Sequence, residues 1–288
     1  MRSFLQALPH VERAGGIHYW TNSEITIDPR VDEVLLAGSV ECADGVQVLK
    51  NARRRRIFRI SGRFGVAGSI VLKSFPLANP LARLRYRKYG LAEFLNYQAA
   101  GKLGIPTAQA HAYFEQRACG FVRNCGLILE DLGEWKTLED LLKTKTAARL
   151  EILLHAIPLL REMFATGVNH IDITPRNMLL SPSASEVRVI DWQYATFVAP
   201  RRIEQLLLQS SHFLNHADLA AHSPEATAWL EELHSACNAP MPFSCFKEAV
   251  SVLQSRKQRY RARLALRPNP PVSQAGGRQN PAGQFQVG

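Results

Sequence analysis

Two hydrophobic patterns divide this chain, and their order along the sequence limits the possible folds more than any other feature. From Gly45 to Glu130, short apolar runs are separated by turn residues, as in antiparallel hairpins, apart from one helical stretch. After about Leu138, apolar residues recur mainly at helical spacing. The change falls near Glu130–Gly133. Strands that precede helices in this segregated way predict an α+β fold of two lobes.

Glycine and proline residues mark where several expected elements end. A helix over about 81–103 ends before Gly104 and Pro106, and a helix over Thr146–Thr166 contains Pro158, which predicts a kink. Helices are also expected over Leu138–Leu142, 201–234 and 243–266. The expected strands are Gly45–Leu49, Arg54–Ser61, Ser69–Phe75, Ala108–Phe114, Gly126–Glu130, Leu179–Leu180 and Val187–Ile190.

These elements predict four segments. Residues 41–132 are expected to form a β-rich N-lobe and residues 133–267 a helical C-lobe. Residues 1–40 form an N-terminal extension for which the pattern predicts no definite structure. Residues 268–288, rich in Pro, Gly and Gln, are expected to be a disordered tail.

Charge indicates an acidic partner, and composition excludes several classes of protein. The 288 residues include 35 Lys and Arg against 25 Asp and Glu, a net charge of +10, which favours nucleic acid, an anionic membrane or a phosphorylated substrate. No nucleic-acid-binding motif accompanies the charge, so no nucleic acid partner is expected. No apolar run approaches the roughly 18–20 residues that cross a bilayer. Five cysteines without a Cys-x-x-Cys pair favour reduced thiols, and we expect a cytoplasmic protein.

The residues most typical of catalysis lie just after the long helix. His170-x-Asp172 is followed by Asn177, and Asp191 comes fourteen residues later at the end of an apolar strand. Phosphoryl transfer from ATP needs a carboxylate that orients the acceptor, an oxygen ligand for a metal ion, and a second carboxylate that holds this metal against the phosphates. Asp172, Asn177 and Asp191 supply these groups in that order, whereas any one of them alone would more often be a capping residue in a surface loop.

The N-terminal half contains matching candidates for nucleotide binding. Lys73 ends an apolar strand, the position of a phosphate-binding lysine, and Glu93, twenty residues later on a predicted helix, is its expected ion-pair partner. Glu130 ends the strand where a hinge would offer backbone groups to adenine. Arg53 and Arg54 lie in a basic turn between two strands, which either covers the phosphates or is a solvated turn.

Together these motifs resemble the protein-kinase-like superfamily, and more narrowly the lipopolysaccharide core kinases (heptose and Kdo kinases) of Gram-negative bacteria. The narrower resemblance also uses Gly90-Leu-Ala-Glu-Phe94, Leu103-Gly-Ile-Pro-Thr107 and Ile190-Asp-Trp192, and it covers roughly residues 45–197. It implies a bilobal kinase fold that uses ATP and Mg²⁺.

The resemblance also implies a role for each candidate residue. Asp172 would be the catalytic base, in a loop organised by His170, while Asn177 and Asp191 would hold Mg²⁺. Lys73 and Glu93 would position ATP. The chain departs from protein kinases at Ile171, where they often have arginine, at Trp192-Gln193, and in lacking an Ala-Pro-Glu segment. These departures argue against a protein substrate.

The implied acceptor is a sugar of the lipopolysaccharide core at the cytoplasmic face of the inner membrane. Three basic clusters could attract this anionic acceptor: Arg53–Arg56, the group Arg83, Arg85, Arg87 and Lys88, and the stretch 256–263. The third cluster lies on an amphipathic helix that either touches the anionic membrane or, more commonly for such helices, packs on its own lobe. Two alternatives stay open: a kinase of another small molecule, of aminoglycoside or choline type, and a catalytically inactive kinase-like binding protein.

Overall fold

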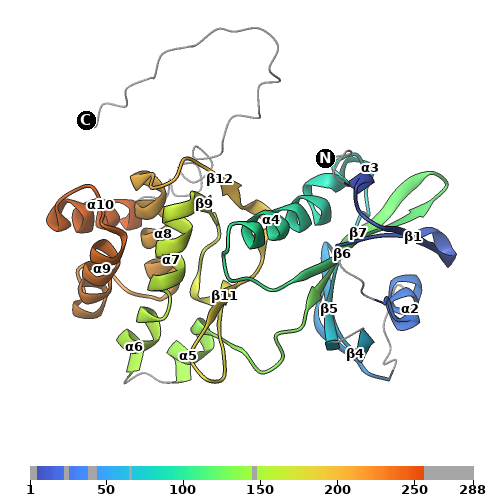
Figure 1. Cartoon of the computed structure of the whole chain (residues 1–288), viewed down its shortest axis with the longest axis horizontal. Coiled ribbons are helices and arrows are strands. Elements are labelled where there is room, and N and C mark those ends of the chain that lie inside the picture. Colours follow the sequence, from blue (N-terminus) through green and yellow to red (C-terminus); the bar gives the residue numbers. More distant parts are fainter. Residues whose placement is uncertain (1–4, 23–25, 38–43, 65–66, 145–147, 256–288) are drawn as a thin grey trace, which may run out of the picture.

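The computed structural model describes residues 5–22, 26–37, 44–64, 67–144 and 148–255. It has a β-rich N-terminal lobe and a helical C-terminal lobe, side by side in Figure 1. The predicted α+β fold class is therefore confirmed. Among the described residues, no helix combines the length and the apolar character needed to cross a membrane.

The N-terminal lobe is built on a seven-stranded antiparallel sheet with the order β1-β2-β6-β7-β5-β4-β3. Residues 1–40, for which the sequence predicted no definite structure, supply two of these strands and the helix α2 (Pro29–Ala37). They escaped prediction because β1 and β2 have only four and five residues. The strands are β1 (His10–Arg13), β2 (Ile17–Thr21), β3 (Val46–Ala52), β4 (Arg55–Phe64), β5 (Ala67–Pro76), β6 (Ala110–Ala118) and β7 (Phe121–Glu130).

The two faces of the sheet are covered by different helices. Ile70 and Leu72 of β5 pack in one apolar cluster with α2, while Leu127 of β7 packs in another with α4 (Gly90–Lys102). Because side chains alternate along a strand, Lys73 points to the face opposite Leu72. The lysine therefore lies on the side of the sheet that α4 covers.

The helix predicted over about 81–103 is interrupted. The structure has α3 (Pro80–Leu84), a 3₁₀ turn at Tyr86–Lys88, and then α4. At its start α4 approaches β7 closely: a Cβ at Gly90 would lie 3.0 Å from the backbone of Gly126. Glycine at position 90 therefore lets the first turn of α4 lie against the sheet.

The C-terminal lobe contains α5 (Leu138–Thr144), α6 (Arg149–Leu154), α7 (Ile157–Thr166), α8 (Ile203–His216), α9 (Pro224–Cys237) and α10 (Phe243–Ser255). The helix predicted over Thr146–Thr166 is divided into α6 and α7, because Pro158 lies at the start of a new helix. Gly167 ends α7 in the left-handed conformation, with φ of 74°. The region 201–234 likewise forms two helices, whereas the basic stretch 256–263 and the predicted tail lie outside the described residues.

Short strands flank the predicted catalytic motif. β10 (Met178–Leu180) pairs with β11 (Val187–Val189) in a hairpin, and β8 (Lys136–Thr137) pairs with the other edge of β10. A second small sheet pairs β9 (Val168–Asn169) with β12 (Thr196–Phe197). The loop after β9 and the segment after β11 therefore lie next to each other between the lobes.

Candidate active site

A buried lysine links two carboxylates at the junction of the lobes. Lys73 Nζ lies 2.6 Å from Glu93 Oε1 and 2.9 Å from Asp191 Oδ1. Lys73 and Glu93 are both buried, and Glu93 has no exposed surface. The ion pair that the sequence predicted between Lys73 and Glu93 is present, and it extends to Asp191 from the other lobe.

The electrostatics of this cluster depend on burial and on two cations. Complete burial raises the pKa of the Glu93 carboxyl, and the ammonium of Lys73 opposes the shift. Burial would also raise the pKa of Asp191, but Lys73 and Arg55 outweigh it and hold this pKa well below its usual range. Asp191 is therefore ionised at neutral pH.

Arg55, rather than Arg53 or Arg54, is the arginine of the basic turn that contacts the cluster. Its Nη1 lies 3.0 Å from Asp191 Oδ2, whereas Arg53 and Arg54 are exposed in the turn between β3 and β4. The alternation of side chains along a strand indicates which way Arg55 faces. Phe58 is buried in the core, so Arg55 and Ile57 face the opposite side of β4, toward the cleft.

A cavity of about 270 Å³ lies between the lobes beside this cluster. Lys73, Arg55 and Asp191 line one part of it. Apolar side chains from both lobes line much of the remainder: Val71, Ala108, Leu129, Leu132, Leu179 and Ile190. A partly apolar cavity with charged groups at one end suits a ligand that combines a flat apolar ring with phosphates.

Glu130 lies at this cavity, but its polar groups are engaged within the protein. Its carboxylate pairs with Arg188 at 2.9 Å and accepts from the backbone N–H of Gln109, and its own backbone N–H donates to the Gln109 carbonyl. The next residue, Asp131, accepts a hydrogen bond from Ser69 Oγ at 2.7 Å and forms an ion pair with Arg59, whose Nε lies 2.9 Å from Asp131 Oδ2. These contacts fix the chain where it passes between the lobes.

The loop after β9 presents Asp172 to the cleft. The side-chain amide of Asn177 donates to the Asp172 carbonyl at 2.8 Å, and the Asn177 carbonyl accepts from the backbone N–H of Ile190 at 3.0 Å. The Asp172 side chain is 52% exposed, so it is open to a ligand. The loop and the segment that carries Asp191 are thus held together by the backbone.

His212 is a residue of this site that the sequence did not indicate. It is buried, and its Nε2 lies 3.2 Å from Asp172 Oδ1. Its hydrogen bond lowers the pKa of Asp172. No local pattern connects residues forty positions apart, so this contact required the fold.

His170 organises the loop from inside the protein. It is buried, its Nε2 lies 3.1 Å from the Ile190 carbonyl, and its ring meets the Trp192 ring edge-on at 4.8 Å. Burial lowers its pKa, which favours the neutral imidazole. His170 can therefore hold Asp191 and its neighbours in place, and its buried ring is not exposed to a ligand.

Helix α4 also holds the segment around Asp191. Tyr97, one turn after Glu93, accepts the backbone N–H of Asp191 at 3.0 Å, and the Asn96 amide donates to the Trp192 carbonyl at 2.8 Å. Asp191 itself has a left-handed backbone, with φ of 64°, which is uncommon for a residue other than glycine. The four-residue spacing from Glu93 to Tyr97 was a signal in the sequence for a shared helix face.

The donor set fits a hard divalent cation such as Mg²⁺. Asn177 uses its amide nitrogen for the Asp172 carbonyl, which leaves Oδ1 as its acceptor atom, and Asp191 is an ionised carboxylate. Carboxylate and amide oxygens are the ligands that Mg²⁺ prefers. The two residues come together through the pairing of β10 with β11, whose register joins Met178 to Val189.

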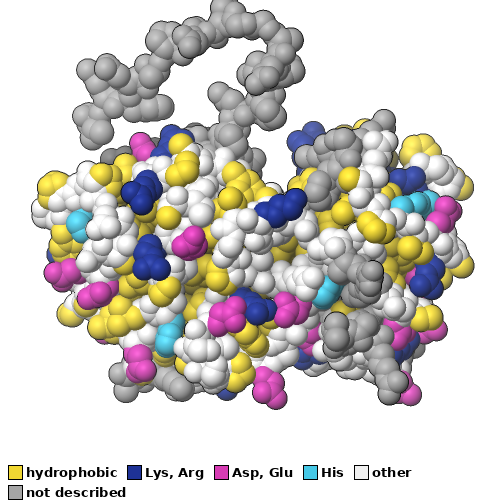
Figure 2. Space-filling view, viewed as in Figure 1, with side chains coloured by type: hydrophobic (Ala, Val, Ile, Leu, Met, Phe, Trp, Pro, Cys, Tyr) yellow, Lys and Arg dark blue, Asp and Glu magenta, His cyan; other side chains and the backbone are white. Residues whose placement is uncertain are grey.

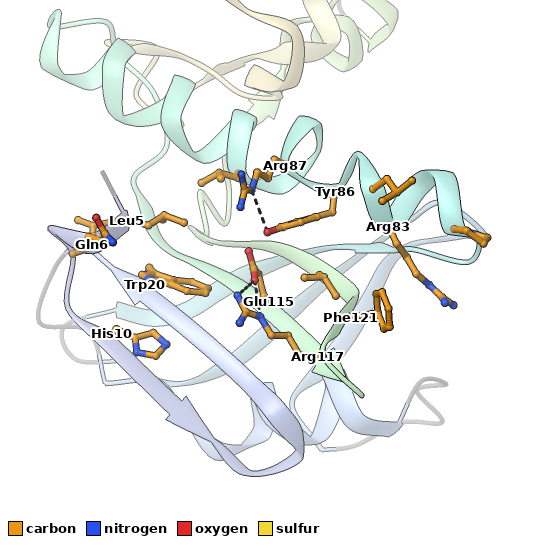
Figure 3. Close-up of a pocket in the computed structure, with 16 residues that line it drawn as sticks. Leu5, Gln6, His10, Trp20, Arg83, Tyr86, Arg87, Glu115, Arg117 and Phe121 are labelled. Atoms are coloured by element: carbon orange, nitrogen blue, oxygen red, sulfur yellow. Dashed lines mark hydrogen bonds and ion pairs between the residues drawn. The ribbon is translucent and has the colours of Figure 1, made fainter. Parts of the chain in front are cut away.

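A larger groove of about 1200 Å³ lies away from these residues (Figure 3). It is formed by β1, β2, the β6–β7 hairpin and the segment around α3, and none of the predicted site residues lines it. Its arginines are engaged: Arg117 pairs with buried Glu115 at 2.9 Å, and Arg87 donates to the Tyr86 hydroxyl at 3.2 Å. Its size alone does not connect it to the chemistry of the cleft.

Comparison with known proteins identifies related sequences and folds. A model of the lipopolysaccharide kinase (Kdo/WaaP) family matches residues 79–206. A solved structure described as "WaaP in complex with acyl carrier protein" has a similar fold, with a TM-score of 0.52 and 16% sequence identity over 85% of this chain and 99% of that chain. The chain has no match among curated proteins.

Proposed function

We propose that this chain, whose residues 79–206 match a model of the lipopolysaccharide kinase (Kdo/WaaP) family, transfers the γ-phosphoryl group of ATP to a sugar hydroxyl, of heptose or Kdo, in the lipopolysaccharide inner core. The observation that carries the proposal is the contact of Lys73 with both Glu93 and Asp191 at one end of the cavity between the lobes. Phosphoryl transfer needs this arrangement, because a fixed cation must meet the phosphates beside the metal-binding carboxylate.

The cavity supplies a site for each part of ATP. The apolar side chains, among them Val71 and Leu179, would enclose the adenine, and Lys73 would contact the phosphates. Glu93 orients Lys73. Asn177 and Asp191 would hold Mg²⁺, which neutralises charge on the phosphates during transfer.

Asp172 would act on the acceptor. Its carboxylate is exposed and its pKa is lowered by the hydrogen bond to His212, so it is ionised at neutral pH and can accept the proton of the attacking hydroxyl. The acceptor oxygen then bonds to the γ-phosphorus as the bond to the leaving oxygen of ADP breaks. The net charge of +10 supports an anionic acceptor over the cationic aminoglycoside or choline substrates of the alternative reaction class.

A deletion strain tests the reaction directly. Mass spectrometry of its lipopolysaccharide core should show the loss of one phosphate, restored by the intact chain but not by the Asp172→Asn variant. Unchanged core phosphate would contradict the proposal. Purified protein that phosphorylates an aminoglycoside or choline instead would favour the small-molecule alternative, and protein that binds ATP without turnover would favour the inactive binding protein.

A peripheral position at the anionic inner membrane is also part of the proposal, since the acceptor is carried on a lipid. Sedimentation with vesicles that contain about 30% phosphatidylglycerol, at low and at high salt, tests it. Charge-driven binding should weaken as the Debye length falls from about 10 Å at 0.1 M to about 3 Å at 1 M salt. Protein that stays in solution at low salt would contradict the membrane contact.

A further inference from the structure

A hollow of about 600 Å³ borders the cleft next to Asp191 and is separate from the groove of Figure 3. Four segments enclose it: the turn between β3 and β4, the end of β5, the segment around α3, and the 3₁₀ turn Trp192–Tyr194. Arg55 lines both this hollow and the nucleotide cavity. An occupant would therefore lie beside the end of the cleft that holds the phosphates.

The charge of this hollow has one sign. Arg53, Arg54, Arg55 and Arg85 line it, and its lining contains no Asp or Glu. Arg55 pairs with Asp191 of the neighbouring site, whereas no carboxylate of the described residues pairs with the other three. Several arginines around one concave surface that has no carboxylate suit an anion, because the guanidinium fork matches phosphate and carboxylate oxygens.

The remaining lining of the hollow is mixed. Asn79, Tyr89, Gln193 and Tyr194 carry polar groups, whereas the other side chains are apolar: Phe75, Pro76, Leu77, Ala78, Leu81 and Ala82. Gln193 and Tyr194 directly follow the Asp191-Trp192 pair that the α4 helix holds in place. The hollow is thus lined in part by the segment that carries Asp191, the proposed metal ligand.

The basic residues of the segment 83–88 line two different concave surfaces, the groove of Figure 3 and the hollow beside Asp191. Arg83 and Arg87 line the groove of Figure 3, and Arg83 also donates to the Leu77 carbonyl at 3.2 Å. Arg85 instead lines the hollow beside Asp191. On the face of the molecule shown in Figure 2, Lys and Arg side chains alternate with Asp and Glu, so the positive charge there is not a continuous patch.

We propose that this hollow is an anion subsite for the acceptor: it binds a phosphate or carboxylate group that the acceptor already carries, separate from the phosphoryl group being transferred. The inference rests on the proposed function, because it requires a phosphoryl acceptor that docks beside Asp191. The same chemistry could come from a phosphate of ATP. The experiment therefore separates these two sources.

The binding test uses the full chain and inorganic phosphate, followed by ³¹P NMR line broadening, with and without a saturating non-hydrolysable ATP analogue and Mg²⁺. Phosphate should still bind when the analogue is present. Arg85→Gln should weaken this binding about tenfold, and the double variant Arg53→Gln/Arg54→Gln should weaken it at least as much. Arg83→Gln, two residues away on the same segment but lining the other groove, is the matched control and should leave it unchanged.

Kinetics with the acceptor complete the test. Arg85→Gln should raise KM for a phosphorylated acceptor about tenfold without changing KM for ATP, and the effect should shrink for an acceptor whose other phosphates have been removed. Phosphate binding that the ATP analogue abolishes would assign the hollow to the nucleotide and overturn the inference. Equal losses from Arg85→Gln and Arg83→Gln would also overturn it. The proposed function fails separately, if the wild-type chain binds no ATP analogue.

Discussion

The two carboxylates of the cleft, Asp191 and Asp172, differ sharply in their surroundings. Asp191 is held between Lys73 and Arg55, cations that come from the N-terminal lobe, and its backbone is bonded to α4. Asp172 is more exposed and pairs only with His212 of its own lobe among the ion pairs described. The comparison indicates that a ligand of Asp191 would take the place of Lys73 or Arg55 beside the carboxylate, as a metal ion would. Asp172, in contrast, is accessible to a ligand that carries a hydroxyl group.

Neutralising Asp191 should have the largest effect, because it removes the proposed metal ligand and also the anion between Lys73 and Arg55. For Asp191→Asn, we expect turnover to fall by more than about 10³-fold and Mg²⁺-dependent ATP binding to weaken at least tenfold. Calorimetry with an ATP analogue, with and without Mg²⁺, measures the second effect. Binding that is as tight as in the wild type with Mg²⁺ present would remove Asp191 from the metal site.

Neutralising Asp172 should reduce turnover without reducing ATP affinity. For Asp172→Asn, we expect kcat to fall about 10²–10⁴-fold, the usual contribution of a general base, because the amide cannot take the proton of the acceptor hydroxyl. The dissociation constant for the ATP analogue should stay within about twofold of the wild-type value. Equal losses of ATP affinity in Asp172→Asn and Asp191→Asn would abolish the distinction between the two carboxylates.

Strand β5, which carries Lys73, and strand β6 leave no room for a side chain at Gly126 of β7, which lies between them. A Cβ at Gly126 would lie 2.0 Å from the Lys73 carbonyl oxygen and 2.7 Å from the Phe114 ring. Gly126→Ala should therefore lower the free energy of unfolding by about 1–3 kcal/mol. Gly101→Ala is the control: it lies in α4 with no atom within 4 Å of the new Cβ, and should raise this free energy by up to about 1 kcal/mol. Urea unfolding of both variants measures the difference, and equal midpoints would contradict the packing argument.

The sequence predicted those contacts of the site that join residues close to each other in the chain or at a known spacing, and it missed the others. The motif from His170 to Asn177 and the ion pair of Lys73 with Glu93 could be predicted, since strand ends, helix starts and fixed spacings define them. The contact of Arg55 with Asp191 spans 136 residues and that of His212 with Asp172 spans forty, and no spacing encodes them.

The same limit applies to the fold. The α+β class and most strands of the N-terminal lobe followed from periodicity, but the interruption near Gly90 did not. It lies where α4 meets β7, which is a contact between elements rather than a property of either one. The strands β1 and β2 were not predicted because their short length gives little periodic pattern.

The smallest expected effect concerns the partner of Asp172. The hydrogen bond from His212 lowers the pKa of Asp172, so a folded chain without it should have a higher Asp172 pKa. Because the base must be ionised to accept a proton, activity falls as pH drops through this pKa. His212→Leu should therefore move the acidic limb of the kcat/KM profile to higher pH, while kcat at pH 8 changes only a few-fold. His216→Leu, one turn further along α8, should move the limb less than His212→Leu does, because the hydrogen bond to Asp172 comes from His212 while the His216 ring packs on the His212 ring. An acidic limb that is identical in wild type and His212→Leu would mean that the histidine only fills space and does not set the pKa of Asp172.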